Sequence, residues 1–218
     1  MTCGPTRPTN TCICWTIRTN GTAVSEITAL DDHTFLVDER DGELEPGAYK
    51  KIFKINTANA TDVGPAATLP GAHYDAANGG LQVDGRTIEG YLEQADTTAA
   101  TAALADVGIT VVSKTLDLDL AGLVSALDPT GGFFGHDKVE GIASVAGGRK
   151  LVISNDSDSG LAGLSNDQPP YQLQAKTLPN GQQDSGEYLV VDTRKVSADG
   201  ASVPTSTGTV TITVRGGR

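Results

Sequence analysis

The feature that most limits the fold is the way turn-forming residues cut the chain into short apolar runs. Glycine occurs 26 times and proline 10 times, and both residue types interrupt regular structure or form turns. A helical periodicity of 3.6 residues is rarely sustained between them. This pattern favours many short strands joined by turns, so we predict an all-β fold.

The first clear strand pair is predicted at Val24–Val37. Its two apolar runs flank Asp31–His33, which has the polar composition of a turn. A third strand is predicted at Tyr49–Ile55, where lysines fall on both faces of the alternating pattern. Lysine on both faces is typical of a half-exposed outer strand, so we expect this strand at the edge of its sheet.

A similar strand pair recurs later in the chain. Val139–Val152 contains Gly147–Gly148, a dipeptide typical of a hairpin turn. At a constant offset of 115 residues, without a gap, the matching positions are Val24 with Val139, Ile27 with Ile142, Leu30 with Val145, Leu36 with Leu151, Val37 with Val152, and Asp41 with Asp156. The matches predict an internal repeat, such as that of a β-propeller, whose blades take about 40–50 residues each.

The rest of the chain mixes helical and strand patterns. We predict helical turns within 88–107 and at 121–127, and strands at 109–120, 171–178 and 187–193.

Three regions follow from these patterns. Residues 1–23 are expected to form an N-terminal strand or frayed segment, and residues 24–196 the β domain. Residues 197–218 read as a Ser/Thr/Gly-rich linker followed by an alternating strand, TVTITV, at 209–214. This last strand either docks on a sheet edge or begins a further module.

The chain is strongly acidic. Its 16 Lys and Arg residues and 27 Asp and Glu residues give a formal net charge of −11. Such a surface repels a phosphate backbone, so we expect no nucleic acid as partner. No run of about 18 apolar residues predicts a transmembrane segment, and the first residues lack a signal-peptide layout. The oligomeric state is not predicted.

The familiar catalytic and metal-binding motifs of hydrolases are missing. No Gly-x-Ser-x-Gly elbow, Walker loop or His-Glu-x-x-His motif occurs. The three cysteines fall at the N-terminus and are interpreted as incidental, with a metal or redox role as the alternative. The histidines are far apart in sequence, and we interpret them as solvated turn residues: His33, His73 and His136.

Two acidic clusters directly follow predicted strands, at Asp38–Asp41 and Asn155–Gly160. Oxygen-rich side chains at a strand end can bind a hard cation such as calcium. The alternative is a turn in which these side chains bond to their own backbone. Arg40 lies between two acids, where it forms either a surface ion pair or, within a cleft, a bidentate contact with a phosphate or carboxylate.

Two glutamates interrupt the starts of apolar strands. Glu26 and Glu140 are one position out of step in the ungapped repeat, so their equivalence requires a β-bulge. A buried carboxylate needs a partner. We hypothesise that the two side chains converge on a common axis, and the alternative is exposure at the strand ends.

Three blocks of sequence resemble one protein family. In order, they are VSEITALDDHTFLVDERDG with YKKIFKINTANATDV, then DKVEGIASVAGGRKLVISNDSDSG, then GEYLVVDTRKV. They are similar to the "esterase-like activity of phytase" family, or phytase-like domain, over most of residues 24–196. The resemblance implies a β-propeller-like fold, usually in exported bacterial proteins that are extracellular or periplasmic. Because members are typically longer, we expect an incomplete propeller of about four blades with a short helical insertion.

The resemblance also implies a hydrolase of phosphate or carboxylate esters, with a small-molecule ester or phosphate as its substrate and calcium as an assisting cation. Arg40 is expected to orient the anionic substrate, and Glu39 or Asp41 to take a proton from the attacking water. The expected calcium ligands are Glu26, Glu140, Asn155, Asp156 and Asp158. The alternatives are a non-catalytic secreted or surface binding module and an inactive fragment of a longer enzyme.

Overall fold

The structure, a computed structural model, describes residues 11, 21–93 and 95–196. Within this part the chain is mostly β, with few helices, and every pair of neighbouring strands is antiparallel. The predicted all-β class is therefore confirmed. All sheets formed by the described residues are open, and no ring of blades is seen among them.

The first sheet has four strands in the order β1-β2-β3-β7. Their bounds are Ala23–Ala29 for β1, Thr34–Arg40 for β2, Lys50–Asn56 for β3 and Ser113–Asp119 for β7. The predicted turn between β1 and β2 is confirmed, because the Asp31 carboxylate accepts hydrogen bonds from the amides of His33 and Thr34 at 2.9 and 2.8 Å. Such a turn reverses the chain within a few residues.

The expectation that the third strand is an outer one is wrong. β3 lies between β2 and β7, and Lys50 at its start is fully buried. The Lys50 ammonium donates to the Glu43 carbonyl oxygen at 2.7 Å and lies 3.8 and 3.9 Å from the carboxylates of Asp41 and Glu45. Burial lowers the pKa of Lys50, although Glu45 and Asp41 oppose that shift. A lysine enclosed by acceptors can thus occupy a central strand.

The second sheet has three strands in the order β12-β9-β8. Their bounds are Val139–Val145 for β8, Lys150–Asn155 for β9 and Tyr188–Asp192 for β12. Helix α3, Leu120–Leu127, joins the two sheets, and Asp119 caps its N-terminus by accepting a hydrogen bond from the Gly122 amide at 2.9 Å. The predicted strand pair at 139–152 and the predicted helical turn at 121–127 are both confirmed.

The β1–β2 and β8–β9 hairpins pair their strands in the same way. Val24 pairs with Glu39 and Glu26 with Asp38, and at the same places in the second hairpin Val139 pairs with Asn155 and Gly141 with Ser154. Each hairpin therefore has a β-bulge one residue after its first valine. The two hairpins thus pair their strands in the same way, and β1 corresponds to β8 at the predicted offset of 115 residues.

The ungapped alignment of the two hairpins is wrong by one residue after the turn, where it compares β2 with β9. Five residues separate Ala29 from its partner Phe35, whereas six separate the equivalent pair, Ser144 and Leu151. The turn that contains Gly147 and Gly148 is longer by that one residue. As a result Val37 corresponds to Ile153 rather than to Val152.

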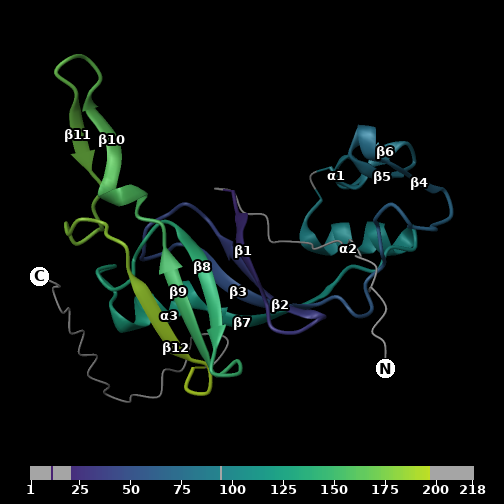
Figure 1. Cartoon of the computed structure of the whole chain (residues 1–218), viewed down its shortest axis with the longest axis horizontal. Helices are drawn as coiled ribbons and strands as arrows, with labels where there is room; N and C mark the ends of the chain where they lie inside the picture. Colours follow the sequence, from purple (N-terminus) through teal and green to yellow (C-terminus); the bar gives the residue numbers. More distant parts are fainter. Residues whose placement is uncertain (1–10, 12–20, 94, 197–218) are drawn as a thin grey trace, which may run out of the picture.

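The main hydrophobic core lies between the two sheets (Figure 1). Leu36 and Ile52 contribute from the first sheet, and Ile142 and Ile153 from the second. Other buried members of this core are Leu118, Leu120, Leu123, Val124, Phe134, Val139, Leu151 and Val191. The sheets also meet at their edges, where the Thr28 hydroxyl in β1 donates to the Ile142 carbonyl oxygen in β8 at 2.6 Å.

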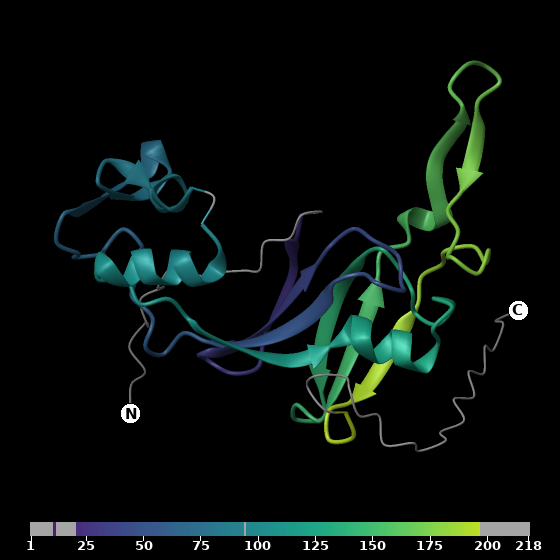
Figure 2. The ribbon, with the colours of Figure 1, turned by 180° about the vertical axis from the view of Figure 1, so that it is seen from behind.

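A small insertion between β3 and β7 has its own core. Its elements are β4 Ala72–Asp75, the 3₁₀ turn Ala76–Asn78, β5 Gly80–Val83, β6 Arg86–Thr87, α1 Ile88–Leu92 and α2 Thr97–Asp106. Leu81, Val83, Leu104 and Ile109 form the buried centre. The insertion lies to one side of the two sheets in both views (Figures 1 and 2). The helical pattern predicted within 88–107 is confirmed.

A hairpin projects from the other end of the molecule (Figure 2). It consists of β10 Leu161–Asn166 and β11 Gln172–Ala175, preceded by the 3₁₀ turn Asp158–Gly160. The hairpin carries exposed apolar side chains at Leu164, Tyr171 and Leu173.

Several predictions fall outside the described residues. They concern Cys3, Cys12 and Cys14, the linker at 197–208 and the alternating strand at 209–214. Within the part of the chain that the structure describes, no helix is long and apolar enough to cross a membrane.

Candidate functional site

Arg40, the last residue of β2, connects the two sheets. Its Nε donates to the Ser25 hydroxyl oxygen at 2.7 Å, and its Nη2 forms a hydrogen-bonded ion pair with the Glu140 carboxylate. Its Nη1 donates a longer hydrogen bond, at 3.4 Å, to the Asp41 carbonyl oxygen. Because the Arg40 side chain is 15% exposed and that of Glu140 is 36% exposed, the ion pair lies at the solvent boundary rather than in the core.

The two β-bulges place both partners of Arg40. Ser25 is the bulged residue of β1, and Glu140 is the bulged residue of β8. A bulge re-aims the side chain of the extra residue relative to the regular strand alternation. The structural counterpart of Glu140 is therefore Ser25, and Glu26 corresponds to Gly141.

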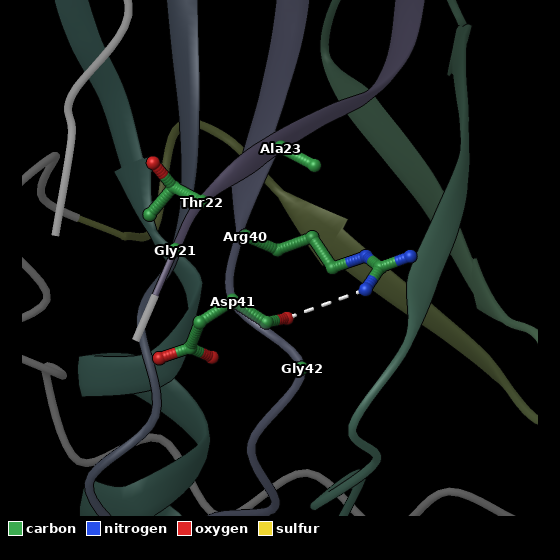
Figure 3. Close-up of a pocket in the computed structure, with 6 residues that line it drawn as sticks. All are labelled: Gly21, Thr22, Ala23, Arg40, Asp41 and Gly42. Atoms are coloured by element: carbon green, nitrogen blue, oxygen red, sulfur yellow. Dashed lines mark hydrogen bonds between the residues drawn. The ribbon is translucent and has the colours of Figure 1, made fainter. Parts of the chain in front are cut away.

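A pocket of about 260 Å³ opens beside the guanidinium. Its lining residues are Gly21, Thr22, Ala23, Arg40, Asp41 and Gly42 (Figure 3). The Arg40 side chain extends from its strand across this region, whereas the Asp41 carboxylate points to the opposite side of the strand from the guanidinium (Figure 3). Arg40 is thus the one cationic group in the wall of a small, solvent-facing pocket.

The two carboxylates predicted to act beside Arg40 have other contacts. The Asp41 carboxylate accepts hydrogen bonds from the amides of Glu43 and Tyr49 at 3.2 and 2.8 Å. Glu39 is fully buried, forms an ion pair with Lys114 and accepts a hydrogen bond from the Tyr49 hydroxyl at 3.2 Å. Since side chains alternate along a strand, Glu39 lies on the opposite face of β2 from Arg40.

Asp38, on the same face of β2 as Arg40, belongs to the acidic cluster noted in the sequence but was given no role of its own there. It is fully buried, and neither of its carboxylate oxygens has a hydrogen-bond partner among the described residues. Burial raises its pKa to about 7; Arg40 and Lys50 oppose this shift, and Glu26 adds to it. The sequence signal is an acid within the apolar strand FLVDER, where the core-facing positions are Leu36, Asp38 and Arg40.

The structure does not gather the five predicted calcium ligands into one site. Glu140 pairs with Arg40, and the Glu26 carboxylate accepts a hydrogen bond from the neighbouring Ile27 amide at 2.7 Å. The Asp156 carboxylate accepts a hydrogen bond from the Asp158 amide at 2.9 Å. Asn155 contacts a separate cluster described below.

Among the predicted calcium ligands, Asp158 is the clearest case of a side chain with other partners, because two ammonium groups contact its carboxylate. Lys138 lies 2.6 Å and Lys176 2.8 Å from its oxygens. These hydrogen bonds lower the pKa of Asp158 to about 2. Within residues 21–93 and 95–196, no group of three or more His, Cys, Asp or Glu side chains is placed to hold a metal ion, so the predicted donor set does not fit calcium in this arrangement.

His136 is not the solvated turn residue that the sequence predicts. It is fully buried, with Nδ1 at 2.7 Å from the Asp184 carboxylate and Nε2 at 3.1 Å from that of Glu187. The Asn155 side chain accepts a hydrogen bond from the Glu187 amide at 2.7 Å and donates one to the Ser185 carbonyl oxygen at 3.0 Å. His33 and His73 are exposed, as predicted.

The His136 cluster attaches the loop before β12 to the second sheet. Lys176 joins it by contacting the carboxylates of Asp137, Asp158 and Asp184 at 2.7, 2.8 and 3.2 Å. Burial opposes the charge on Lys176, but these hydrogen bonds together raise its pKa. Every acid here has a basic partner, and the cluster makes contacts between segments rather than lining the Arg40 pocket.

One comparison with known proteins identifies the family. The sequence model described as "Phytase-like: Esterase-like activity of phytase" matches residues 5–159, a range that begins before and ends earlier than the expected 24–196. No curated protein and no solved structure matches the chain. Because the family match spans more than half of the 218 residues, the chain belongs to the phytase-like family.

Proposed function

We propose that the protein is a hydrolase of phosphate or carboxylate esters that binds the anionic group of its substrate at Arg40. The observation that carries this proposal is the guanidinium held between Ser25 and Glu140 in the wall of the 260 Å³ pocket. Membership of the phytase-like family supports a hydrolase. The chemistry of the pocket wall supports the proposed substrate class.

A guanidinium fixed in one orientation suits an anionic substrate. Its planar fork matches the oxygens of a phosphate or carboxylate, which it can bind through two parallel hydrogen bonds. Ser25 holds Nε and leaves the two Nη groups to face Glu140 and Asp41. In the proposed complex the substrate anion takes the place of Glu140 at Nη2. The acidic net charge of −11 makes such a local cation necessary, since the protein otherwise repels an anion.

Displacement of Glu140 also supplies a base. Once released from Arg40, its partly exposed carboxylate can accept a proton from a water molecule in the pocket. The water oxygen then attacks the phosphorus or carbonyl carbon, the bond to the leaving oxygen breaks, and that oxygen takes a proton from solvent. Glu140 replaces Glu39 and Asp41 in this role, because Glu39 faces Lys114 and the Asp41 carboxylate accepts two backbone amides.

Calcium assistance remains a prediction of the family resemblance. Lys138 and Lys176 occupy the carboxylate of Asp158, and Arg40 occupies that of Glu140. We therefore derive no step that involves a metal ion.

The stacking of the sheets supports a propeller-like plan for the family domain. Ile153 faces the core between the sheets, whereas its counterpart, Val37, lies on the opposite face of the first sheet. The two sheets therefore meet through non-equivalent faces, as successive blades of a propeller do. Sheets related by a two-fold axis would instead meet through the same face. We also propose, from the family resemblance, a bacterial protein with an extracellular or periplasmic location.

One observation favours a second candidate, a non-catalytic module that binds an anion. Arg40 already has a carboxylate partner, and the pocket lining contains no serine, cysteine or histidine. Such a module would bind phosphate at Arg40 without turnover.

Two chromogenic esters and one matched variant pair test the proposal. The wild type is expected to hydrolyse 4-nitrophenyl phosphate, whose anionic group can bind Arg40; 4-nitrophenyl acetate carries no anionic group and tests for hydrolysis of a carboxylate ester that does not depend on Arg40. Arg40→Gln removes a charge-assisted contact worth about 1.5–3 kcal/mol, so kcat/KM for the phosphate ester should fall about 10- to 100-fold. The control is Arg86→Gln, at an exposed arginine of the insertion that pairs with Glu93.

Each outcome decides between the candidates. Full activity in Arg40→Gln, or equal losses in both variants, would refute the role of Arg40. Calorimetric binding of inorganic phosphate that requires Arg40, without turnover of either ester, would identify the non-catalytic module instead.

A further inference from the structure

The outer edge of β12 is unpaired among the described residues. β12 forms its ladder with β9 on one side, and no described strand lies on the other (Figure 1). Leu189 and Val191 of β12 face the core, whereas Tyr188 and Val190 are exposed by 78% and 56%. A free edge next to exposed apolar side chains is a surface that proteins usually cover.

The first sheet indicates what belongs at this edge. By strand order β12 occupies the position of β3, and in the first sheet β7 pairs with the other side of β3. Leu118 of β7 lies opposite Ile52 of β3, and both belong to the core between the sheets. The second sheet has no counterpart of β7 among residues 11, 21–93 and 95–196.

We propose that residues 209–214 of this chain bind the free edge of β12 as an antiparallel fourth strand. The sequence TVTITV alternates threonine with Val210, Ile212 and Val214. This alternation matches an edge strand with one face on a core and one in water. The apolar row would extend the row formed by Leu189 and Val191, as Leu118 extends that of Ile52.

The path of the chain after β12 supports an intramolecular contact. The Lys195 amide donates to the Asp192 carbonyl oxygen at 2.9 Å, which forms a turn directly after the strand. Val196 then packs against the core between the sheets. The chain thus begins to reverse beside β12, and residues 197–208 are more than long enough for the few residues that an antiparallel connection requires.

Hydrogen exchange of the β12 amides tests the proposal. The full chain is compared with a chain that ends at Gly208, under the same conditions and at the same protein concentration. Amides of Tyr188–Asp192 that point away from β9 should exchange at least about tenfold more slowly in the full chain, because strand addition protects them. Amides of Leu36 and Val37 in the first sheet serve as a check that both proteins are folded.

A pair of substitutions in the full chain keeps the test valid if the shortened chain does not fold. Ile212→Asp places a charge in the row that should face the core, so it should abolish the protection of β12. Thr211→Asp alters the adjacent position on the water-facing row and should preserve it.

Two results would overturn the proposal. One is equal exchange of β12 in all four proteins. The other is protection that appears only as the protein concentration rises together with a dimeric mass in sedimentation, because a second copy would then cover the edge.

Discussion

Replacement of Asp38 by asparagine is the most direct test of how much the buried Asp38 carboxylate destabilises the folded protein when it is ionised. The carboxylate is fully buried in β2, and neither oxygen has a hydrogen-bond partner within the described residues. Asparagine has nearly the same shape and cannot ionise, so Asp38→Asn removes the charge and leaves the packing nearly unchanged.

The magnitude follows from the pKa of Asp38. Burial raises this pKa from 3.8 to about 7, and one pKa unit corresponds to about 1.4 kcal/mol. Between these two pKa values the folded protein holds a proton that the unfolded chain has released. The free energy of unfolding therefore decreases as the pH rises from about 4 to about 7. Above that range the ionised carboxylate costs the folded state about 4 kcal/mol.

The assay is urea unfolding of the wild type and of Asp38→Asn at about pH 4 and about pH 8. Other acids contribute equally to both proteins and cancel in the comparison. The variant should gain about 4 kcal/mol of stability relative to the wild type between the two pH values. Asp167→Asn, at an exposed loop position, is the control for the substitution itself. A difference between variant and wild type that does not change with pH would refute the reasoning.

Three further predictions follow from the core, an ion pair and the acidic turn. Ile153→Ala removes a fully buried side chain of the core between the sheets and should lower the free energy of unfolding by about 2–5 kcal/mol in urea titration; a loss below about 1 kcal/mol would contradict the packing. Lys114→Met removes the ammonium group that pairs with the buried Glu39 carboxylate and should cost about 3 kcal/mol, whereas an unchanged urea midpoint would contradict that account. Calcium should leave the melting temperature in calorimetry equal to that in chelator, because lysines already hold Asp158; a rise with calcium would restore the metal prediction.

The sequence predicted the strands of the two larger sheets, because these strands have a clear local pattern, but it did not predict β4, β5, β6 or β10. The alternating runs and the Asp31 turn identify β1 and β2 without knowledge of the partner strands. The strand register of the second hairpin could not be predicted from local pattern. A turn one residue longer changes which residues are equivalent, and an ungapped alignment cannot contain that residue.

Burial of polar residues was the main error, because it depends on contacts that form only in the folded chain. Lys50 is enclosed by acids of the loop before β3, and His136 by Asp184 and Glu187, which lie some fifty residues later in the chain. Residue type alone favours exposure for lysine and a surface turn for histidine. Only the folded chain shows that these groups have partners.

The residue that occupies the position of Arg40 in the second hairpin explains why a chain with two similar hairpins has a single Arg40 pocket. Arg40 pairs with Ala23 across β1 and β2. At the equivalent place in the second hairpin, the Asp156 amide donates to the Lys138 carbonyl oxygen at 3.0 Å. The basic residue of the first hairpin therefore corresponds to an acid in the second, and Asp41, which the sequence aligns with Asp156, does not share its position. Because β1 and β8 are adjacent, the two bulged residues converge on the one arginine instead of forming two separate sites. In the proposed function, the anion is therefore bound where the two sheets meet.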